Sequence, residues 1–289
     1  MKAKLIILTP VYNDWKNLDK LLSKINKLFL NKIKQKFDLI IVDDSSSEKK
    51  NFSKSKFNKI KNIIILENKT NLGSQRSIAI GMRYIKNKYK KNYNLIVIDS
   101  DGQDNPLGII ELIEKFNKTN YCVVARRGQR KESIWFKFFY EIYCFLIFLL
   151  SFKKIRFGNF SLLSFKDINK ILKDKNLWNA FPPTLSLNLD KISFITIDRD
   201  KRYSGISKMN FFGLANHALR VFSVLRTRIF YSSIFYSIFV FLILKNNFLI
   251  IYAFFLFSLI FLNISNFSLY VLNKNNFEQR YKETTISKL

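Results

Sequence analysis

Short apolar runs alternate with stretches of helical periodicity through the first half of the chain. The apolar runs read as strands at residues 5–8, 37–42, 63–66, 95–98 and 121–125. Between them, apolar residues recur every three or four positions, which predicts helices at residues 15–30, 75–89 and 107–116. This alternation predicts an α/β fold with a parallel or mostly parallel sheet that helices cover on both faces.

The second half of the chain is more apolar, and charge divides it into segments. Residues 134–152 contain Lys137 and Glu141, which favours an amphipathic helix on a membrane surface or on the domain over a membrane span. Residues 210–228 have the same mixed character. Residues 229–244 and 248–272 carry no charge and are separated by Lys245-Asn246-Asn247, so they predict a transmembrane hairpin, with a soluble core as the alternative.

Basic residues near the hairpin predict its orientation. Residues 200–228 hold six Lys or Arg residues and the tail after the hairpin holds four, whereas the loop inside the hairpin holds one. The positive-inside rule then places both flanks in the cytosol. We therefore expect a multi-pass protein of the cytoplasmic membrane, with an α/β domain at 1–209, an interfacial helix at 210–228, a hairpin at 229–272 and a cytosolic tail at 273–289.

Composition excludes disorder and suggests an anionic partner. The 289 residues include 49 Lys and Arg against 21 Asp and Glu, a net charge of +28, yet 48% are hydrophobic and 16% aromatic. Such a chain can build a core, and the charge is compatible with nucleic acid, a membrane surface or a phosphorylated substrate. A general Lys and Asn bias of the sequence would produce much of the same charge. The two cysteines, Cys122 and Cys144, lie in apolar runs without metal-ligand spacing and are expected to be buried free thiols.

Polar residues follow four consecutive predicted strands. They are Thr9 to Asp14, Asp43-Asp44-Ser45-Ser46, Glu67 to Gly73, and Asp99-Ser100-Asp101-Gly102-Gln103-Asp104. Ligands of open α/β sheets bind beyond the carboxyl ends of the strands. Two carboxylates one residue apart, Asp99 and Asp101, suit Mg²⁺ or Mn²⁺ with sites left for phosphate oxygens, and Gln103 offers a further oxygen ligand.

These motifs resemble those of a known enzyme family. Pro10-Val11-Tyr12-Asn13, Asp43-Asp44-Ser45, Asn71-Leu72-Gly73 with Gly81, and Asp99-Ser100-Asp101-Gly102-Gln103 resemble, in order and spacing, the motif set of family 2 glycosyltransferases with the GT-A fold. Gly158 to Ser164 and Arg202 to Lys208 resemble the polyprenyl-phosphate (dolichol-phosphate-type) mannose and glucose synthases. Asn159 departs from that subgroup, many members of which have an acidic residue or Ser there.

The resemblance implies an inverting transfer of a hexose from GDP-mannose or UDP-glucose to polyprenyl phosphate. It implies catalytic roles for Asp101 and Arg127, and a metal site made by Asp99, Asp101 and Gln103. Residues implied in nucleotide-sugar binding are Pro10, Tyr12, Asn13, Asp14, Asp43, Asp44, Asp99, Ser100 and Asp101. Residues implied in binding the acceptor phosphate are Arg127, Arg130, Arg202, Ser207 and Lys208.

The residue chemistry agrees with a phosphate acceptor, and two other readings stay open. A phosphate is ionised at neutral pH and needs cationic positioning rather than a general base. A family 2 enzyme that extends a lipid-linked or surface glycan would instead need a carboxylate base. The third reading is a non-catalytic basic membrane protein, but the basic residues are not interleaved with aromatics as in single-strand binding, so we expect no nucleic-acid partner. Membrane lipids are expected partners, and a homo-oligomer is compatible with the sequence.

Overall fold

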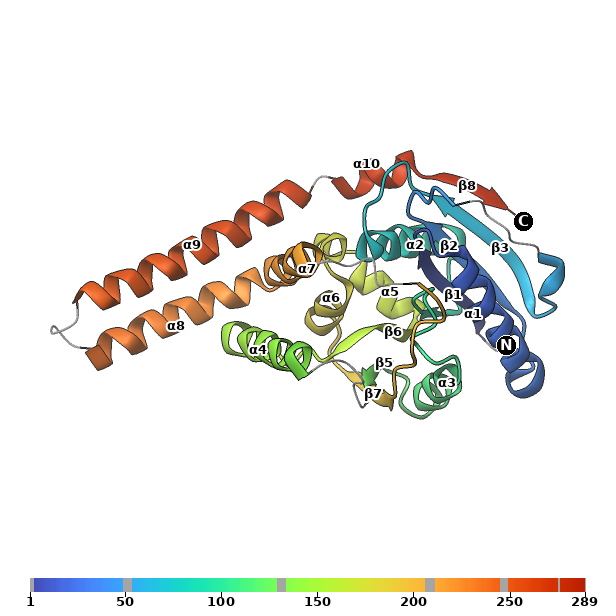
Figure 1. Ribbon diagram of the computed structural model, residues 1–289, viewed down its shortest axis with the longest axis horizontal. Helices are drawn as coiled ribbons and strands as arrows, with labels where there is room; N and C mark the ends of the chain where they lie inside the picture. Colours follow the sequence, from blue (N-terminus) through green and yellow to red (C-terminus); the bar gives the residue numbers. More distant parts are fainter. Residues whose placement is uncertain are drawn as a thin grey trace.

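The computed structural model describes residues 3–48, 54–128, 134–205, 211–244, 249–274 and 276–288. The chain forms an α/β domain from which two long helices project as a hairpin (Figure 1). The predicted α/β fold is therefore confirmed.

The core of the domain is one mixed sheet of eight strands in the order β7-β5-β6-β4-β1-β2-β3-β8. Strands β1 to β4 are parallel neighbours, β5 and β7 are also parallel to each other, and β6 and β8 are antiparallel to their neighbours. The strands are β1 (Lys4–Val11), β2 (Phe37–Asp43), β3 (Ile60–Glu67), β4 (Tyr93–Val97), β5 (Cys122–Arg127), β6 (Phe157–Ser164), β7 (Ile192–Ile197) and β8 (Thr285–Lys288).

Helices cover both faces of the sheet and bury an apolar cluster on each. One cluster packs α1 and α3 on the sheet, and the other packs α2, α5 and α6. The helices of the domain are α1 (Trp15–Leu28), which continues as a π-helical turn (Phe29–Ile33), α2 (Ser74–Lys88), α3 (Gly108–Thr119), α4 (Ile134–Ser151), α5 (Phe165–Ile171) and α6 (Phe181–Asn188). Short 3₁₀ turns cover Lys54–Lys56 and Lys175–Trp178.

The strand register brings the polar strand ends to one edge of the sheet. Val11 pairs with Asp43, and Asp43 pairs with Glu67, so β1, β2 and β3 end side by side. Because β6 runs antiparallel to β4, its first residues lie at the edge where β4 ends. The residues that follow β1 to β4 therefore meet the start of β6 at this edge, which we call the donor edge.

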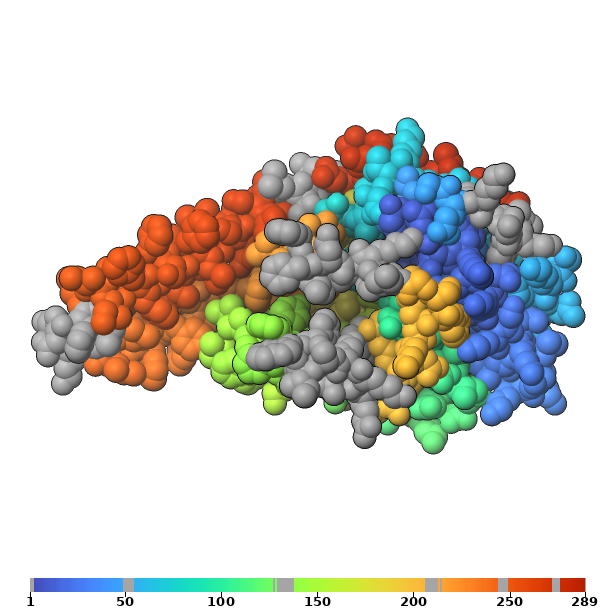
Figure 2. Space-filling model, viewed as in Figure 1, coloured from blue at the N-terminus to red at the C-terminus, as the bar shows by residue number. Residues whose placement is uncertain are grey.

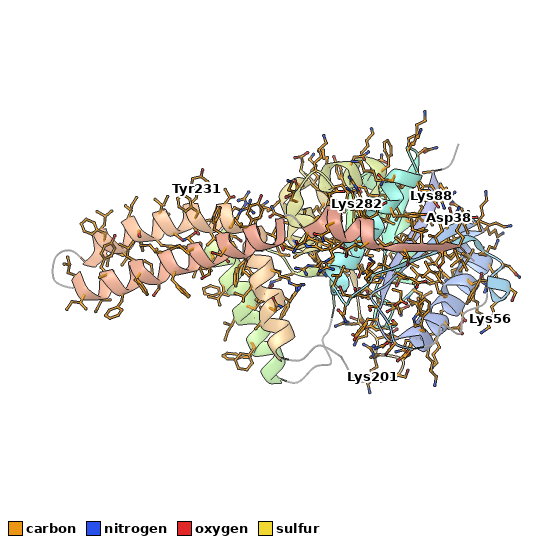
Figure 3. All side chains as sticks on the ribbon, turned by 90° about the horizontal axis from the view of Figure 1, so that it is seen from above. Asp38, Lys56, Lys88, Lys201, Tyr231 and Lys282 are labelled. Carbon is orange, nitrogen blue, oxygen red and sulfur yellow. The ribbon has the colours of Figure 1, made fainter. Side chains whose placement is uncertain are left out.

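The hairpin is made of two helices whose side chains are largely exposed. Helix α7 (Phe211–Val224) leads into α8 (Arg226–Leu244), and α9 (Leu249–Lys274) returns beside it. Both α8 and α9 are long and apolar enough to cross a membrane, and side chains such as Tyr231 project outward along the hairpin (Figure 3). Asn263 Nδ2 donates to Ser233 Oγ across the two helices at 2.9 Å, so this amide faces the partner helix.

The last residues fold back onto the domain. Helix α10 (Asn276–Glu283) places Phe277 on the ring of Trp178, with centroids 5.1 Å apart, and Glu278 pairs with Arg83 at 2.9 Å. Strand β8 then pairs antiparallel with β3 and completes the sheet, as the red ribbon beside β3 shows (Figure 1). The hairpin therefore starts from and returns to the same body.

Candidate active site

The Asp99-Ser100-Asp101 segment lies directly beyond β4 at the donor edge. Gly102 adopts φ +77°, a backbone conformation that glycine reaches at no steric cost. The tight turn lets the Gln103 N–H donate to Asp101 Oδ1 at 3.0 Å. The sequence thus fixes the backbone that presents both carboxylates at this edge.

A chain of amide groups supports Asp99. Asn159 Nδ2 donates to Asp99 Oδ1 at 3.0 Å. Gln75 Nε2 in turn donates to Asn159 Oδ1 at 2.9 Å, and Gln75 Oε1 accepts from the Phe181 N–H at 2.7 Å. An amide at position 159 can donate to Asp99, whereas a carboxylate there would repel it. Asn159 therefore holds the Asp99 carboxylate in place.

On the nucleoside side, Asn13 and Asp44 shape the loops. Asn13 Oδ1 accepts from the Ser47 N–H at 2.7 Å. The buried carboxylate of Asp44 accepts from the Leu72 N–H at 2.9 Å and from the Gly73 N–H at 2.7 Å. Both side chains therefore hold the backbone around the site.

The remaining residues predicted on this side lie as follows. Asp43 accepts from the Ser46 N–H at 3.0 Å, Pro10 is buried within β1, Ser100 is buried, and Tyr12 is 38% exposed. The strand register places the segments that carry them at the same edge. The donor edge thus gathers all the predicted nucleotide-sugar residues.

Arg202 lies between two carboxylates at the donor edge. Its guanidinium is 2.5 Å from Asp14 and 3.6 Å from Asp101. Burial raises the pKa of Asp14, and the charge of Arg202 partly offsets that rise. The resemblance implied that Arg202 binds the acceptor phosphate. In the structure its partners are Asp14 and Asp101, which were predicted to bind the nucleotide sugar.

The loop that carries Arg202 follows β7 and lies against the donor edge. The Asp200 N–H donates to the Gln103 carbonyl at 2.9 Å, and Ser204 Oγ donates to Asn17 Oδ1 at 2.5 Å. In the space-filling view, this golden segment lies across the front of the molecule between the blue and green helices (Figure 2).

A small hollow lies behind this loop. Its free volume is about 20 Å³, room for about one water molecule. Its lining includes Asp99, Asp104, Arg126, Asn159, Asp198 and Arg199. Sequence reasoning missed Asp198 and Arg199 because it did not expect a strand at 192–197, although a charged run after a strand was the available signal.

The structure describes only some of the residues predicted to bind the acceptor phosphate. Arg127 is the last residue of β5, and Arg130, Ser207 and Lys208 lie outside the described residues. Gly205, in the same predicted loop, has φ +78°. The structure therefore locates only part of the predicted phosphate loop.

The donor edge has two carboxylates of the kind that bind a hard divalent cation. Among the residues that the structure describes, no three His, Cys, Asp or Glu side chains are grouped to hold a metal ion. Mg²⁺ is commonly bound by one or two carboxylates together with substrate phosphates. Asp99 and Asp101, one residue apart beyond β4, are such a pair.

Comparisons with known proteins identify the family. The glycosyl transferase family 2 profile matches residues 6–179, more than half of the chain. An uncharacterized glycosyltransferase of Synechocystis, sll0501, is 28% identical over 76% of this chain and 68% of its own length. The uncharacterized glycosyltransferase YkcC of Bacillus subtilis is 29% identical over 45% of this chain and 39% of its own length.

Among solved structures, the chain resembles glucosyl-3-phosphoglycerate synthase from Mycobacterium tuberculosis, whose crystals contain Mn²⁺, UDP-glucose and glycerol 3-phosphate. The TM-score is 0.54 at 14% identity, over 78% of this chain and 80% of that one. This likeness shows the fold, and the family profile covers the donor-edge motifs at residues 10 to 103. The chain belongs to glycosyltransferase family 2 and has the GT-A fold.

Proposed function

We propose that this glycosyltransferase transfers a hexose from a nucleotide sugar of the GDP-mannose or UDP-glucose type to polyprenyl phosphate, with inversion, at the cytosolic face of a membrane. The proposal rests on one combination of features. The donor edge has two carboxylates that could bind a divalent cation, and the same chain has a hairpin whose apolar surface is largely exposed.

The donor side of the proposal rests on the residues gathered at the donor edge. Asp99 and Asp101 would hold Mg²⁺ or Mn²⁺ with the donor diphosphate, with Gln103 beside them. When bound, the cation would neutralise charge on the leaving nucleoside diphosphate. Tyr12, Asp14 and Asp43 would bind the nucleoside, and Asn13 and Asp44 would keep their loops in place.

The acceptor side of the proposal rests on charge and on Asn159. An ionised phosphate oxygen would attack the anomeric carbon as the bond to the nucleoside diphosphate breaks, so no proton has to be removed. The amide of Asn159 donates to Asp99 and supplies no base, which is compatible with such an acceptor. The acceptor phosphate would be held by Arg127, Arg130, Arg202, Ser207 and Lys208. To reach it, Arg202 would have to break its ion pair with Asp14.

The membrane part of the proposal rests on exposed apolar surface. On the hairpin, Ile250 and Phe254 are 74% and 71% exposed, a state that lipid would relieve. Since β8 pairs with β3, the domain and the tail lie on one side of any membrane that the hairpin crosses. The basic flanks favour the cytosolic side.

A second candidate function is the extension of a glycan on a sugar hydroxyl. Asp104 and Asp198 line the hollow at the donor edge, and one of these carboxylates would act as the base that a hydroxyl acceptor needs. The family and the fold are compatible with both functions.

Product analysis separates the two. Purified full-length protein is incubated with Mn²⁺, a panel of labelled nucleotide sugars, and either polyprenyl phosphate or a lipid-linked sugar. The proposal expects label in the organic extract only with polyprenyl phosphate, released by mild acid. Acid-stable label that depends on the lipid-linked sugar would favour glycan extension, with Asp104→Asn and Asp198→Asn as the variants that identify its base.

A further inference from the structure

Three arginines from distant parts of the chain converge at the base of the hairpin. They are Arg76 in the first turn of α2, Arg220 in α7 and Arg280 in α10. The Arg220 guanidinium lies over Gly73, where Nη1 would be 3.7 Å from a Cβ atom at that position. Burial, together with the charges of Arg220 and Arg280, lowers the pKa of Arg76 to about 10, so the three guanidinium groups interact.

Carboxylates lie near two of the three arginines. Asp44 lies near Arg76, and its oxygens also accept from the N–H groups of Leu72 and Gly73. Glu283 pairs with Arg280 at 3.1 Å. Among the described residues, no carboxylate oxygen lies within 4.0 Å of Arg220, and burial lowers the pKa of its guanidinium. A half-buried guanidinium in such surroundings favours an anion.

The backbone adds to the same preference. Gly73 is the N-cap residue of the 15-residue helix α2. Its own N–H donates to Asp44 and the Arg76 N–H donates to the Gly73 carbonyl at 3.1 Å, so the donors at this end are the N–H groups of Ser74 and Gln75. The helix dipole adds partial positive charge at this end. Together with the arginines, this end of α2 has the features of a phosphate site: cationic side chains, N–H donors and partial burial.

The position of the cluster points to a lipid. Helix α7 leads into the hairpin and α10 follows it, so two of the three arginines flank the apolar helices at their junction with the domain (Figure 1). Arg226, the first residue of α8, stacks on Tyr270 of α9 with 3.4 Å between its Cζ atom and the ring centroid, and ties the helices together there. Basic pockets at this level of a membrane protein bind lipid head groups.

We propose that Arg76, Arg220 and Arg280 bind the phosphate group of a membrane lipid at the base of the hairpin, beside the part of the donor edge that Asp44 occupies. The proposal rests on the membrane location in the proposed function. Two lipids carry this chemistry at that level, the polyprenyl-phosphate acceptor and an anionic phospholipid such as phosphatidylglycerol.

A binding assay tests the site without sugar transfer. Full-length protein in neutral detergent is titrated with farnesyl phosphate, farnesol, short-chain phosphatidylglycerol and inorganic phosphate. The fluorescence of Trp178 provides a signal, since its ring lies 5.1 Å from the Arg76 guanidinium. The variants are Arg220→Gln and Arg220→Lys, and the exposed Arg228→Gln is the matched control that removes the same charge from the adjoining helix.

We expect the loss of Arg220, and not that of Arg228, to weaken binding of the phosphate lipid. A hydrogen bond to a charged group contributes about 1.5–3 kcal/mol, so Arg220→Gln should weaken binding of the phosphate lipid by about 10-fold to 100-fold. Arg220→Lys should recover part of the loss, and Arg228→Gln should bind within about 2-fold of the parent. Tighter binding of farnesyl phosphate than of phosphatidylglycerol identifies the acceptor as the source, and the reverse order identifies the phospholipid.

Three results would overturn the proposal: equal binding of farnesol and farnesyl phosphate, equal weakening by Arg220→Gln and Arg228→Gln, or inorganic phosphate binding as tightly as the lipids. Nucleotide binding with Mn²⁺, measured on each variant, shows that it is folded, and Arg76→Gln replaces any variant that is not. If no donor supports transfer while lipid binding still depends on Arg220, the proposed function fails and the lipid site stands.

Discussion

Alanine at position 102 should release the loop that carries Arg202. Gly102 has φ +77°, and an added Cβ would overlap ring carbons of Tyr203. The left-handed backbone alone costs a residue with a side chain about 1–2 kcal/mol, and overpacking costs about 1–3 kcal/mol more. Gly205 is a matched control, since it has φ +78° and nothing within 4 Å of an added Cβ.

Two measurements separate the backbone strain at position 102 from the overlap of the added Cβ with Tyr203. Gly102→Ala should lower the midpoint of thermal unfolding further than Gly205→Ala does, by roughly 2–10 °C for the additional 1–3 kcal/mol. Limited trypsin digestion should cut after Lys201 or Arg202 faster in Gly102→Ala, because Tyr203 can no longer pack on the turn. Equal midpoints and equal cleavage rates in the two variants would refute the packing of this loop on the Asp101 turn.

Three further predictions concern buried groups. Asp44→Ala leaves the Leu72 and Gly73 N–H groups without their acceptor, so it should lower the free energy of unfolding, measured in urea, by about 2–5 kcal/mol. Replacing the exposed Asp190 by Ala should leave the urea midpoint unchanged, and equal unfolding curves for the two variants would contradict the role of Asp44. Burial raises the pKa of the Cys122 thiol, so this thiol should resist alkylation at pH 8 in the native protein and should react once the protein is unfolded. Fast labelling of Cys122 in the native protein would contradict its burial. Burial and the charge of Arg220 lower the pKa of His217, so its contribution to stability is present above the ordinary histidine pKa and is lost as the pH falls below it. The unfolding midpoint of His217→Gln should therefore fall less than that of the parent between pH 7.5 and pH 5, and parallel curves would count against a half-buried neutral His217.

The alternating pattern predicted the elements of the first half closely. The apolar runs at residues 5–8 and 37–42 lie inside β1 and β2, and the helix expected at 75–89 is α2, shifted by one residue. These elements are long or fully buried, so periodicity alone identifies them. The donor edge followed from them, since the carboxyl ends of parallel strands meet at one edge.

Contacts between distant residues were beyond the sequence pattern. Arg202 pairs with Asp14, 188 residues away, and nothing local in either segment encodes that ion pair. Strand β8 is four residues long and three of them are polar, so no alternation marked it, and its place follows from the exposed edge of β3. The bond from Asn159 to Asp99 likewise depends on β6 running antiparallel to β4.

The most direct test of the central claim is lipid-linked product formation by the purified full-length protein. Labelled nucleotide sugar, Mn²⁺ and polyprenyl phosphate are supplied, and label in the organic extract is compared between the parent and Asp101→Asn. The account predicts extractable label that mild acid releases, with a loss of about 10-fold to 100-fold in Asp101→Asn because a charged contact to the donor complex is removed. No lipid-linked label with any nucleotide sugar, or full transfer by Asp101→Asn, would contradict it.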